Sequence, residues 1–182
     1  MKYLPISPQL FTKNRLKFSQ QMAPKSVAVF NSNDVFSTGA DSTLPFEQHR
    51  NIFYLSGVDQ EESILVLFPD AIEKSHREIL FVKETNDHIA VWEGAKLSKV
   101  QATAATGIET VYWLSEFDTI FPKLMEKATG FYFNNNAHYR QAVEMETRND
   151  RFLNKVKSTY PNHKLIPNFP IMESIRGIKE PE

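Results

Sequence analysis

Short, wholly apolar runs restrict the fold of this chain more than any other feature. Residues 27–30, 64–68 and 79–82 contain no polar side chain. A strand that is apolar on both faces belongs in a sheet covered on both sides, as in α/β proteins. These runs are also far shorter than the ~20 apolar residues of a membrane helix. We therefore expect buried strands in an α/β domain and no membrane span.

Other elements are expected between these strands. Ser7-Pro8 provides an N-cap and a first-turn proline for a helix over about 8–22. Because an interior proline removes a backbone hydrogen bond, Pro122 is expected in the first turn of a helix that begins near 118 or 119. Residues 161–170 are interpreted as a loop. Further helices are predicted over 97–106, capped by Ser98, and over 139–160, and further strands over 52–55, 88–92, 110–113 and 131–133.

This order predicts a single α/β domain: a mixed sheet of about six strands, flanked by helices on both faces. The 182 residues fit one domain, and no internal repeat is visible. The final residues, from 171 to 182, begin a new helix-like pattern.

Composition and charge argue against nucleic acid as a partner and against secretion. The 21 Lys and Arg balance 22 Asp and Glu, so no broad positive field is available for nucleic acid. The first 25 residues lack the apolar core of a secretory signal, and the chain has no cysteine. Both observations fit a cytoplasmic protein, although the lack of cysteine excludes only disulfide and thiolate chemistry.

No pattern in the sequence makes a complete catalytic or metal site. The six glycines never cluster into a phosphate-binding loop, and the five histidines lack metal-helix spacing. Glu61-Glu62 and the pair Glu144 and Glu146 diverge in direction, because neighbours in a strand and residues two apart on a helix face different ways. A Ser-His-Asp triad cannot be assigned without geometry. We expect no catalytic residue and no metal ligand in this chain.

Two features remain as candidates for function. Trp92, beside Gly94 at the end of a predicted strand, is either a surface platform for stacking or a partly buried core residue. Residues 36–57 mix polar and apolar side chains, which is typical of a hydrogen-bonded structural network.

The same segment carries a family resemblance. Asp41-Ser42, Pro45-Phe46, Gln48 and residues 53–57 (Phe-Tyr-Leu-Ser-Gly) resemble, in order and spacing, the aminopeptidase P N-terminal domain. Thr38 and Glu47 depart from it, since many relatives carry arginine there, and Ser56 replaces the commoner threonine. The match continues over nearly the whole chain, at Arg15, Leu16, Met22, Pro24, Ser26, 65–67, 80–81, 92–94, 176–179 and 181–182.

This resemblance implies a two-domain parent enzyme. Residues 1–170 would form its N-terminal domain, and 171–182 would start a C-terminal "pita-bread" catalytic domain. In the family, that second domain binds two metal ions, usually manganese, through two Asp, one His and two Glu. The enzyme cleaves the bond between an N-terminal residue and a following proline, by means of a metal-activated water.

The resemblance also implies a role for the first domain. It would wall the substrate cleft and pack on a neighbouring subunit in a homo-oligomer, a dimer or tetramer. Trp92 matches a tryptophan that contributes to the cleft and is the one substrate-binding residue expected here. Two alternatives stay open: the N-terminal domain of a prolidase, which cleaves Xaa-Pro dipeptides, and a stand-alone binding or assembly module.

Overall fold

The computed structural model describes residues 6–40, 42–135 and 145–178, with the side chains of Asp87, Trp92 and Glu93 outside the description. Its centre is one six-stranded sheet in the order β4-β3-β2-β1-β5-β6. β2 is antiparallel to both of its neighbours, and all other adjacent pairs are parallel. The strands are β1 (Ser26–Asn31), β2 (Ile64–Leu67), β3 (Glu78–Val82), β4 (Thr110–Trp113), β5 (Gly130–Phe133) and β6 (Lys164–Pro167).

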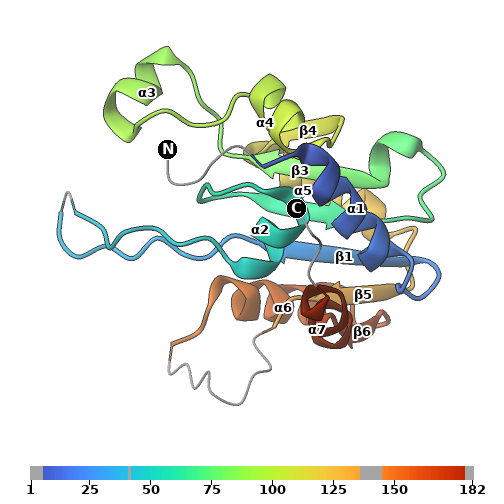
Figure 1. Cartoon of the computed structure of the whole chain (residues 1–182). Coiled ribbons are helices and arrows are strands. Elements are labelled where there is room, and N and C mark those ends of the chain that lie inside the picture. The colour runs from blue at the N-terminus through green and yellow to red at the C-terminus, as the bar shows by residue number, and fades with distance from the viewer. Residues whose placement is uncertain (1–5, 41, 136–144, 179–182) are drawn as a thin grey trace.

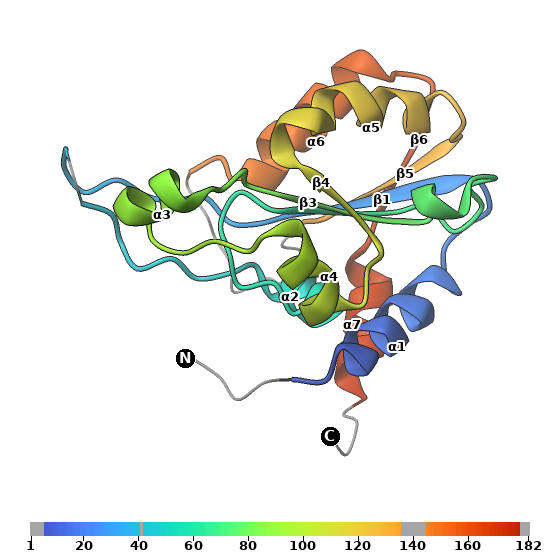
Figure 2. The same cartoon turned by 90° about the horizontal axis from the view of Figure 1, so that it is seen from above.

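Helices cover both faces of this sheet (Figure 2). One face carries α5 and α6, and the other carries α1, α2, α4 and α7, while α3 lies beyond one end of the sheet (Figure 1). The predicted mixed sheet between two helical layers is thus confirmed. The helices are α1 (Pro8–Ser19), α2 (Arg50–Ser56), α3 (Asp87–Glu93), α4 (Lys99–Thr106), α5 (Phe117–Met125), α6 (Arg148–Thr159) and α7 (Phe169–Gly177).

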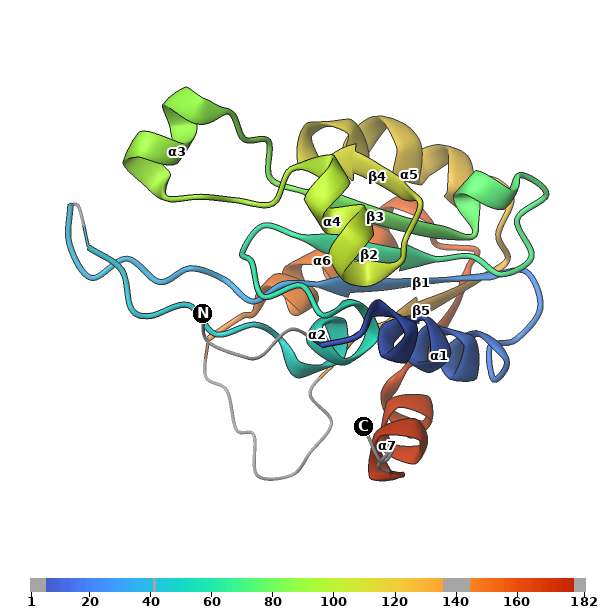
Figure 3. The same cartoon turned by 45° about the horizontal axis from the view of Figure 1, so that its top comes forward.

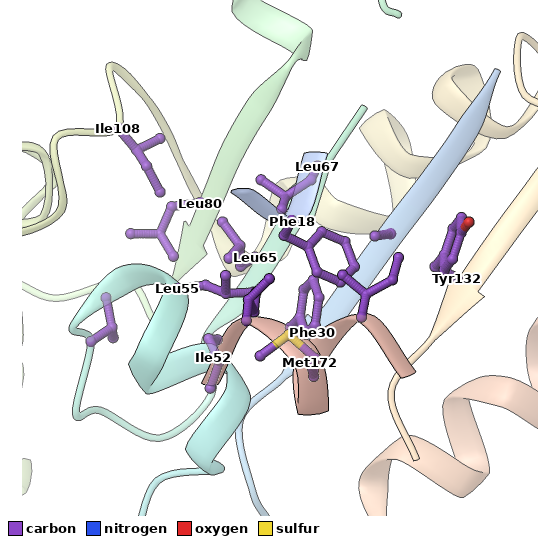
Figure 4. Packing of buried hydrophobic residues seen from close by; sticks show 14 of the residues in the cluster. Phe18, Phe30, Ile52, Leu55, Leu65, Leu67, Leu80, Ile108, Tyr132 and Met172 are labelled. Atoms are coloured by element: carbon purple, nitrogen blue, oxygen red, sulfur yellow. The ribbon is translucent and has the colours of Figure 1, made fainter. Parts of the chain in front are cut away.

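Alternation along the strands creates two separate cores. Ala28 and Phe30 of β1 face the α1 side, whereas Val27 and Val29 face the α5 side. Phe18 of α1 packs edge-on against Phe30, with ring centroids 5.2 Å apart (Figure 4). Because every residue of β1 is buried, an apolar run without alternation is what this position requires.

Helix α1 crosses the C-terminal ends of two other helices. The buried Arg15 donates from Nη1 to the carbonyl oxygens of Leu55 at 2.9 Å and Thr106 at 3.0 Å, in the last turns of α2 and α4. Its Nε donates to Glu78 at 2.8 Å. Burial lowers the pKa of Arg15, and the nearby Glu78 carboxylate opposes that shift. A cation at two helix C-termini compensates the partial negative charge of both.

The predicted strand at 52–55 is wrong, because these residues form helix α2. The His49 side chain accepts from the backbone N–H of Asn51 and caps the helix start. Gly57 ends the helix with φ of +72°, a left-handed conformation that favours glycine. A four-residue apolar run fits a helix or a strand, and here the caps at both ends decide for the helix.

The predicted strand at 88–92 is also wrong, because these residues belong to helix α3. Asn86 caps its N-terminus by accepting from the backbone N–H of Ile89 at 2.9 Å. Gly94 follows with φ of +79°. An Asn N-cap favours helix over strand for a short mixed segment, because it satisfies a backbone donor that a helix start leaves open.

Three further predictions differ from the structure. Pro122 lies in the middle of α5, which begins at Phe117, because the stacked rings of Phe117 and Phe121 hold the helix on the sheet despite the lost hydrogen bond. Helix α6 begins at Arg148, and the part of the predicted helix over 139–144 lies outside the described residues. The predicted loop over 161–170 contains β6, whose Pro167 is tolerated at the end of an edge strand.

Candidate functional site

The carboxyl ends of the five mutually parallel strands lie at one end of the sheet. In open α/β sheets, ligands bind outside the carboxyl ends of the strands, where the connections from two neighbouring strands lead to opposite faces of the sheet. Here β1 leads into the long segment 33–48, and β3 leads into the segment that contains α3. Both segments extend beyond the same end of the sheet (Figure 3). We therefore take this end as the candidate functional site.

Residues 33–40 and 42–48 form a two-limbed ribbon, named the β1 ribbon below. Its limbs pair through a bridge between Ser37 and Thr43. The backbone N–H of Leu44 donates to the carbonyl oxygen of Phe36 at 2.9 Å. Val35, Phe36 and Leu44 are 44%, 47% and 54% exposed, respectively. The ribbon therefore holds its own shape while it presents apolar side chains to the outside.

The first limb is held at its base by helix α6. Asp34 accepts from the backbone N–H of Arg148 at 2.9 Å and pairs with the guanidinium of Arg151. Arg148 also donates from Nη1 to the hydroxyl of Ser32 at 2.8 Å. Burial lowers the pKa of Arg148, and the nearby Asp34 opposes that shift. A carboxylate at a helix N-terminus also gains from the helix dipole.

The second limb is held by Gln48. Its amide donates to the carbonyl oxygen of Gln60 at 2.8 Å, and its Oε1 accepts from the backbone N–H of His49 at 2.8 Å. Between the limbs, Asn33 donates to the carbonyl oxygen of Glu47 at 3.0 Å. The base of the ribbon is thus fixed on two sides.

A groove of about 750 Å³ lies beside the first limb, on the α5 and α6 face. Its wall is lined with ion pairs, such as Lys83 with Glu62 at 2.8 Å and Lys155 with Asp118 at 2.9 Å. Glu61 and Glu62 diverge as predicted, since Glu61 binds Lys96 and Glu62 binds Lys83. The expected reason is wrong, because the two residues lie in a bend before β2 rather than in a strand. These carboxylates are occupied by cations rather than directed at one ligand.

Polar side chains gather on the other side of the same end, at the start of α2. Asn51 donates to the side-chain oxygen of Asn134 at 2.7 Å, and Asn168 donates to the same oxygen at 3.1 Å. Arg176 of α7 donates to Asn51 at 2.9 Å. His49 lies against Asn134, with Nδ1 3.2 Å from its amide nitrogen. The network links α2, β5 and α7, as predicted for polar groups in the 36–57 segment.

Burial, followed by the nearby Arg176 and Arg50, lowers the pKa of His49 from 6.5 to about 4. The unfolded chain then binds one more proton than the folded chain between these two values, so acid favours unfolding there. We expect the free energy of unfolding to fall by about 2 kcal/mol between pH 7 and pH 5 through this group.

Urea unfolding at the two pH values measures this loss. His49→Asn keeps an N-cap acceptor but has no titrating ring, and should remove most of the pH dependence. His76→Asn, in the turn before β3, is the matched control and should retain it. An unchanged pH dependence in His49→Asn would show that His49 is not the responsible group.

Trp92 lies on α3, at the functional end of the sheet, but its side chain is outside the description. Whether it forms a stacking platform therefore stays a prediction. Val91, next to it, is 77% exposed. Within residues 6–40, 42–135 and 145–178, no three His, Asp or Glu side chains gather closely enough to hold a metal ion.

Sequence reasoning missed the attachment of the β1 ribbon to α6. Asp34 and Arg148 are 114 residues apart, and no spacing rule connects them. The available signal was the run of polar residues 31–34 at the end of a buried strand, which names no partner for Asp34. No helix in the described part of the chain is long and apolar enough to cross a membrane.

Comparisons with known proteins agree with this architecture. A family model described as the aminopeptidase P N-terminal domain matches residues 11–132. The Xaa-Pro aminopeptidase of Haemophilus influenzae is 23% identical over 171 residues, which are 94% of this chain and 37% of that protein. Human Xaa-Pro aminopeptidase 3 is 33% identical over 106 residues, which are 57% of this chain and 21% of that protein.

A solved structure supports the fold independently. A Bacillus anthracis protein assigned as an aminopeptidase P matches with a TM-score of 0.83 and 21% identity, over 96% of this chain and 41% of that one. At this identity, the likeness concerns the fold alone. The chain spans less than half the length of each of these relatives.

Proposed function

This chain belongs to the aminopeptidase P N-terminal domain family, and we propose that it is the non-catalytic N-terminal domain of a Xaa-Pro aminopeptidase. The observation that carries the proposal is the family match over 11–132, together with relatives named Xaa-Pro aminopeptidase. The parent enzyme would release the N-terminal residue that precedes a proline. In this proposal, the chemistry belongs to a second domain of the parent enzyme, and this chain corresponds to 37% of the Haemophilus influenzae relative.

In this proposal, the domain walls the substrate cleft with its functional end. The β1 ribbon and α3 extend beyond the sheet and present Phe36, Leu44 and Val91, which are 47%, 54% and 77% exposed. Exposed apolar side chains that gather at one end are typical of a surface that meets another protein or a ligand. We propose that they contact the catalytic domain of a neighbouring subunit in a dimer or tetramer, with Trp92 reaching the peptide.

The remaining assignments follow from the family resemblance. Two manganese ions would lie in the catalytic domain, where they activate the attacking water. The enzyme would act in the cytoplasm, a proposal with which the absence of a membrane-crossing helix among the described residues is compatible.

Kinetics of the full-length protein test the proposal. With manganese, it should hydrolyse peptides of the form Xaa-Pro-Yaa, and Trp92→Ala should lower kcat/KM for them by about tenfold, the scale of one lost substrate contact. Ile72→Ala is the matched control, because Ile72 is an 88% exposed apolar residue between β2 and β3, at the other end of the sheet. Kinetics unchanged by Trp92→Ala would remove the role of Trp92.

The alternatives give different results in the same assay. A prolidase would hydrolyse Xaa-Pro dipeptides such as Gly-Pro and leave longer peptides intact. A stand-alone module would hydrolyse neither. The 182-residue chain alone should give no turnover with manganese, and measurable hydrolysis would contradict the assignment of catalysis to another domain. Reading the coding sequence past residue 182 for two Asp, one His and two Glu in family order distinguishes an enzyme from a module directly.

A further inference from the structure

The β1 ribbon depends on its base for its direction. Among the described residues from 35 to 46, the hydrogen bonds found are internal to the ribbon, such as that from Thr38 N to the carbonyl oxygen of Ser42 at 2.8 Å. Residues 35–40 and 42–45 are exposed. Since the body of the domain does not bury these residues, the orientation of the ribbon is set where its limbs join the sheet.

Asp34, three residues after the end of β1, ties the first limb to helix α6 by two contacts. The carboxylate of Asp34 binds the α6 backbone at Arg148 with one oxygen and the Arg151 guanidinium with the other. Asp34 is only 22% exposed, so solvent screens this pair less than it screens a fully exposed one. Asn31, at the end of β1, donates to Asn149 of α6 at 3.0 Å and strengthens the same junction.

A small rotation at the base of the ribbon produces a larger displacement at its tip. The limb from Asp34 to Ser37, where the bridge to Thr43 precedes the turn at the tip, is about 10 to 13 Å long at the rise of an extended chain. A rotation of about 10° at the base therefore moves the start of the tip by about 2 Å. Displacements of about 1 Å in groups that position a substrate can cost a large factor in rate. A change at residue 34 can therefore act far from the residue itself.

We propose that Asp34 is a positioning residue, which directs the β1 ribbon by joining it to the N-terminal turn of α6. This inference rests on the proposed function, in which the ribbon helps to wall the peptide cleft. Asp34 itself does not contact the substrate. Its effect passes through the orientation of the ribbon, and so it should influence substrate binding more than the chemical step.

A distance measurement tests whether Asp34 orients the β1 ribbon and needs no activity assay. The chain has no cysteine, so cysteines introduced at Gly39, near the tip, and at the 79% exposed Val100 on α4 can carry the only spin labels. A Cβ at Gly39 meets no atom within 4 Å. Pulsed electron paramagnetic resonance should give a narrow distance distribution for the parent pair, and a shifted or broadened one after Asp34→Ala.

Two variants control for loss of structure. Asp34→Asn keeps an acceptor for the Arg148 N–H but loses the charge that pairs with Arg151, and should give an intermediate distribution. Asp118→Asn, on α5, removes the carboxylate that binds Lys155 of α6, away from the Asp34 junction. This variant should leave the distance distribution unchanged. If Asp34→Ala fails to fold, as judged by circular dichroism, Asp34→Asn decides. A distribution unchanged in a folded Asp34 variant overturns the proposal.

Kinetics then connect the positioning to the reaction. In the full-length protein, Asp34→Ala should raise KM for Xaa-Pro-Yaa peptides by about fivefold to tenfold with kcat within about twofold, because binding rather than chemistry is affected. If KM is unchanged although the ribbon is displaced, the ribbon lies outside the cleft. That result would overturn the proposed link between ribbon orientation and substrate binding. Absence of hydrolysis in the wild type would instead refute the proposed function, while the distance measurement still decides the role of Asp34 at the junction.

Discussion

Replacement of Arg15 by methionine will lower the free energy of unfolding by about 3 to 5 kcal/mol, the usual cost of breaking a buried charged network. The Arg15 side chain is 0% exposed, and it donates to the carbonyl oxygens of Leu55 and Thr106. Those two buried acceptors lose this donor, at about 1 to 3 kcal/mol each. Glu78 contributes less, because it is 33% exposed and can turn to solvent. Denaturant unfolding measures the loss.

Two further substitutions show whether geometry or charge is responsible. Arg15→Lys retains the charge but not the planar fork, so it should recover only part of the stability. The exposed Arg50, replaced by methionine, is the control and should change stability by less than about 0.5 kcal/mol. If Arg15→Met proves as stable as Arg50→Met, the two helix ends do not depend on this guanidinium.

Gly57→Ala should destabilise the domain by about 2 to 5 kcal/mol, for two reasons that add. A left-handed alanine costs about 1 to 2 kcal/mol, and forced overpacking costs about 1 to 3 kcal/mol. The new Cβ would lie 2.2 Å from Cε2 of Phe11, whose ring is buried in the core and only 4% exposed. Thermal and denaturant unfolding provide the measurement.

Gly107 provides a matched control for the backbone cost. It ends α4 with φ of +71°, close to the +72° of Gly57, and likewise faces α1. There an added Cβ meets the Thr12 hydroxyl at 2.8 Å, the end of a side chain that can rotate away. Gly107→Ala should therefore lose only about 1 to 2 kcal/mol. Equal losses at the two sites would mean that Phe11 moves aside without cost.

The buried strands could be predicted from the sequence because a strand that is buried on both faces is apolar at every position. Residues 27–30, 64–68 and 79–82 are apolar throughout, and all three runs pair as neighbours in the centre of the sheet. Their order within the sheet could not be predicted from composition alone. Which strand pairs with which depends on crossovers, and an apolar run carries no information about its partner.

The errors fall where short-range chemistry decides between two structures. Residues 52–55 could form a strand or a helix, and the His49 cap and the left-handed Gly57 select the helix. Histidine is an uncommon N-cap, so the sequence gives little warning of it. The functional end was harder still, because Asp34 and Arg148 meet only after β1 and α6 have both reached the same end of the sheet.

The position of β1 has a consequence for synthesis on the ribosome. One edge of β1 pairs with the nearby β2, but the other pairs with β5, and Ser26 faces Gly130 across that ladder. At usual translation rates, the roughly 100 residues between them take about 5 to 20 s to emerge. During that interval the nascent chain carries an apolar strand with one open edge, the kind of surface that chaperones shield. Slower translation of the region before residue 130 would lengthen the time for which this edge stays open.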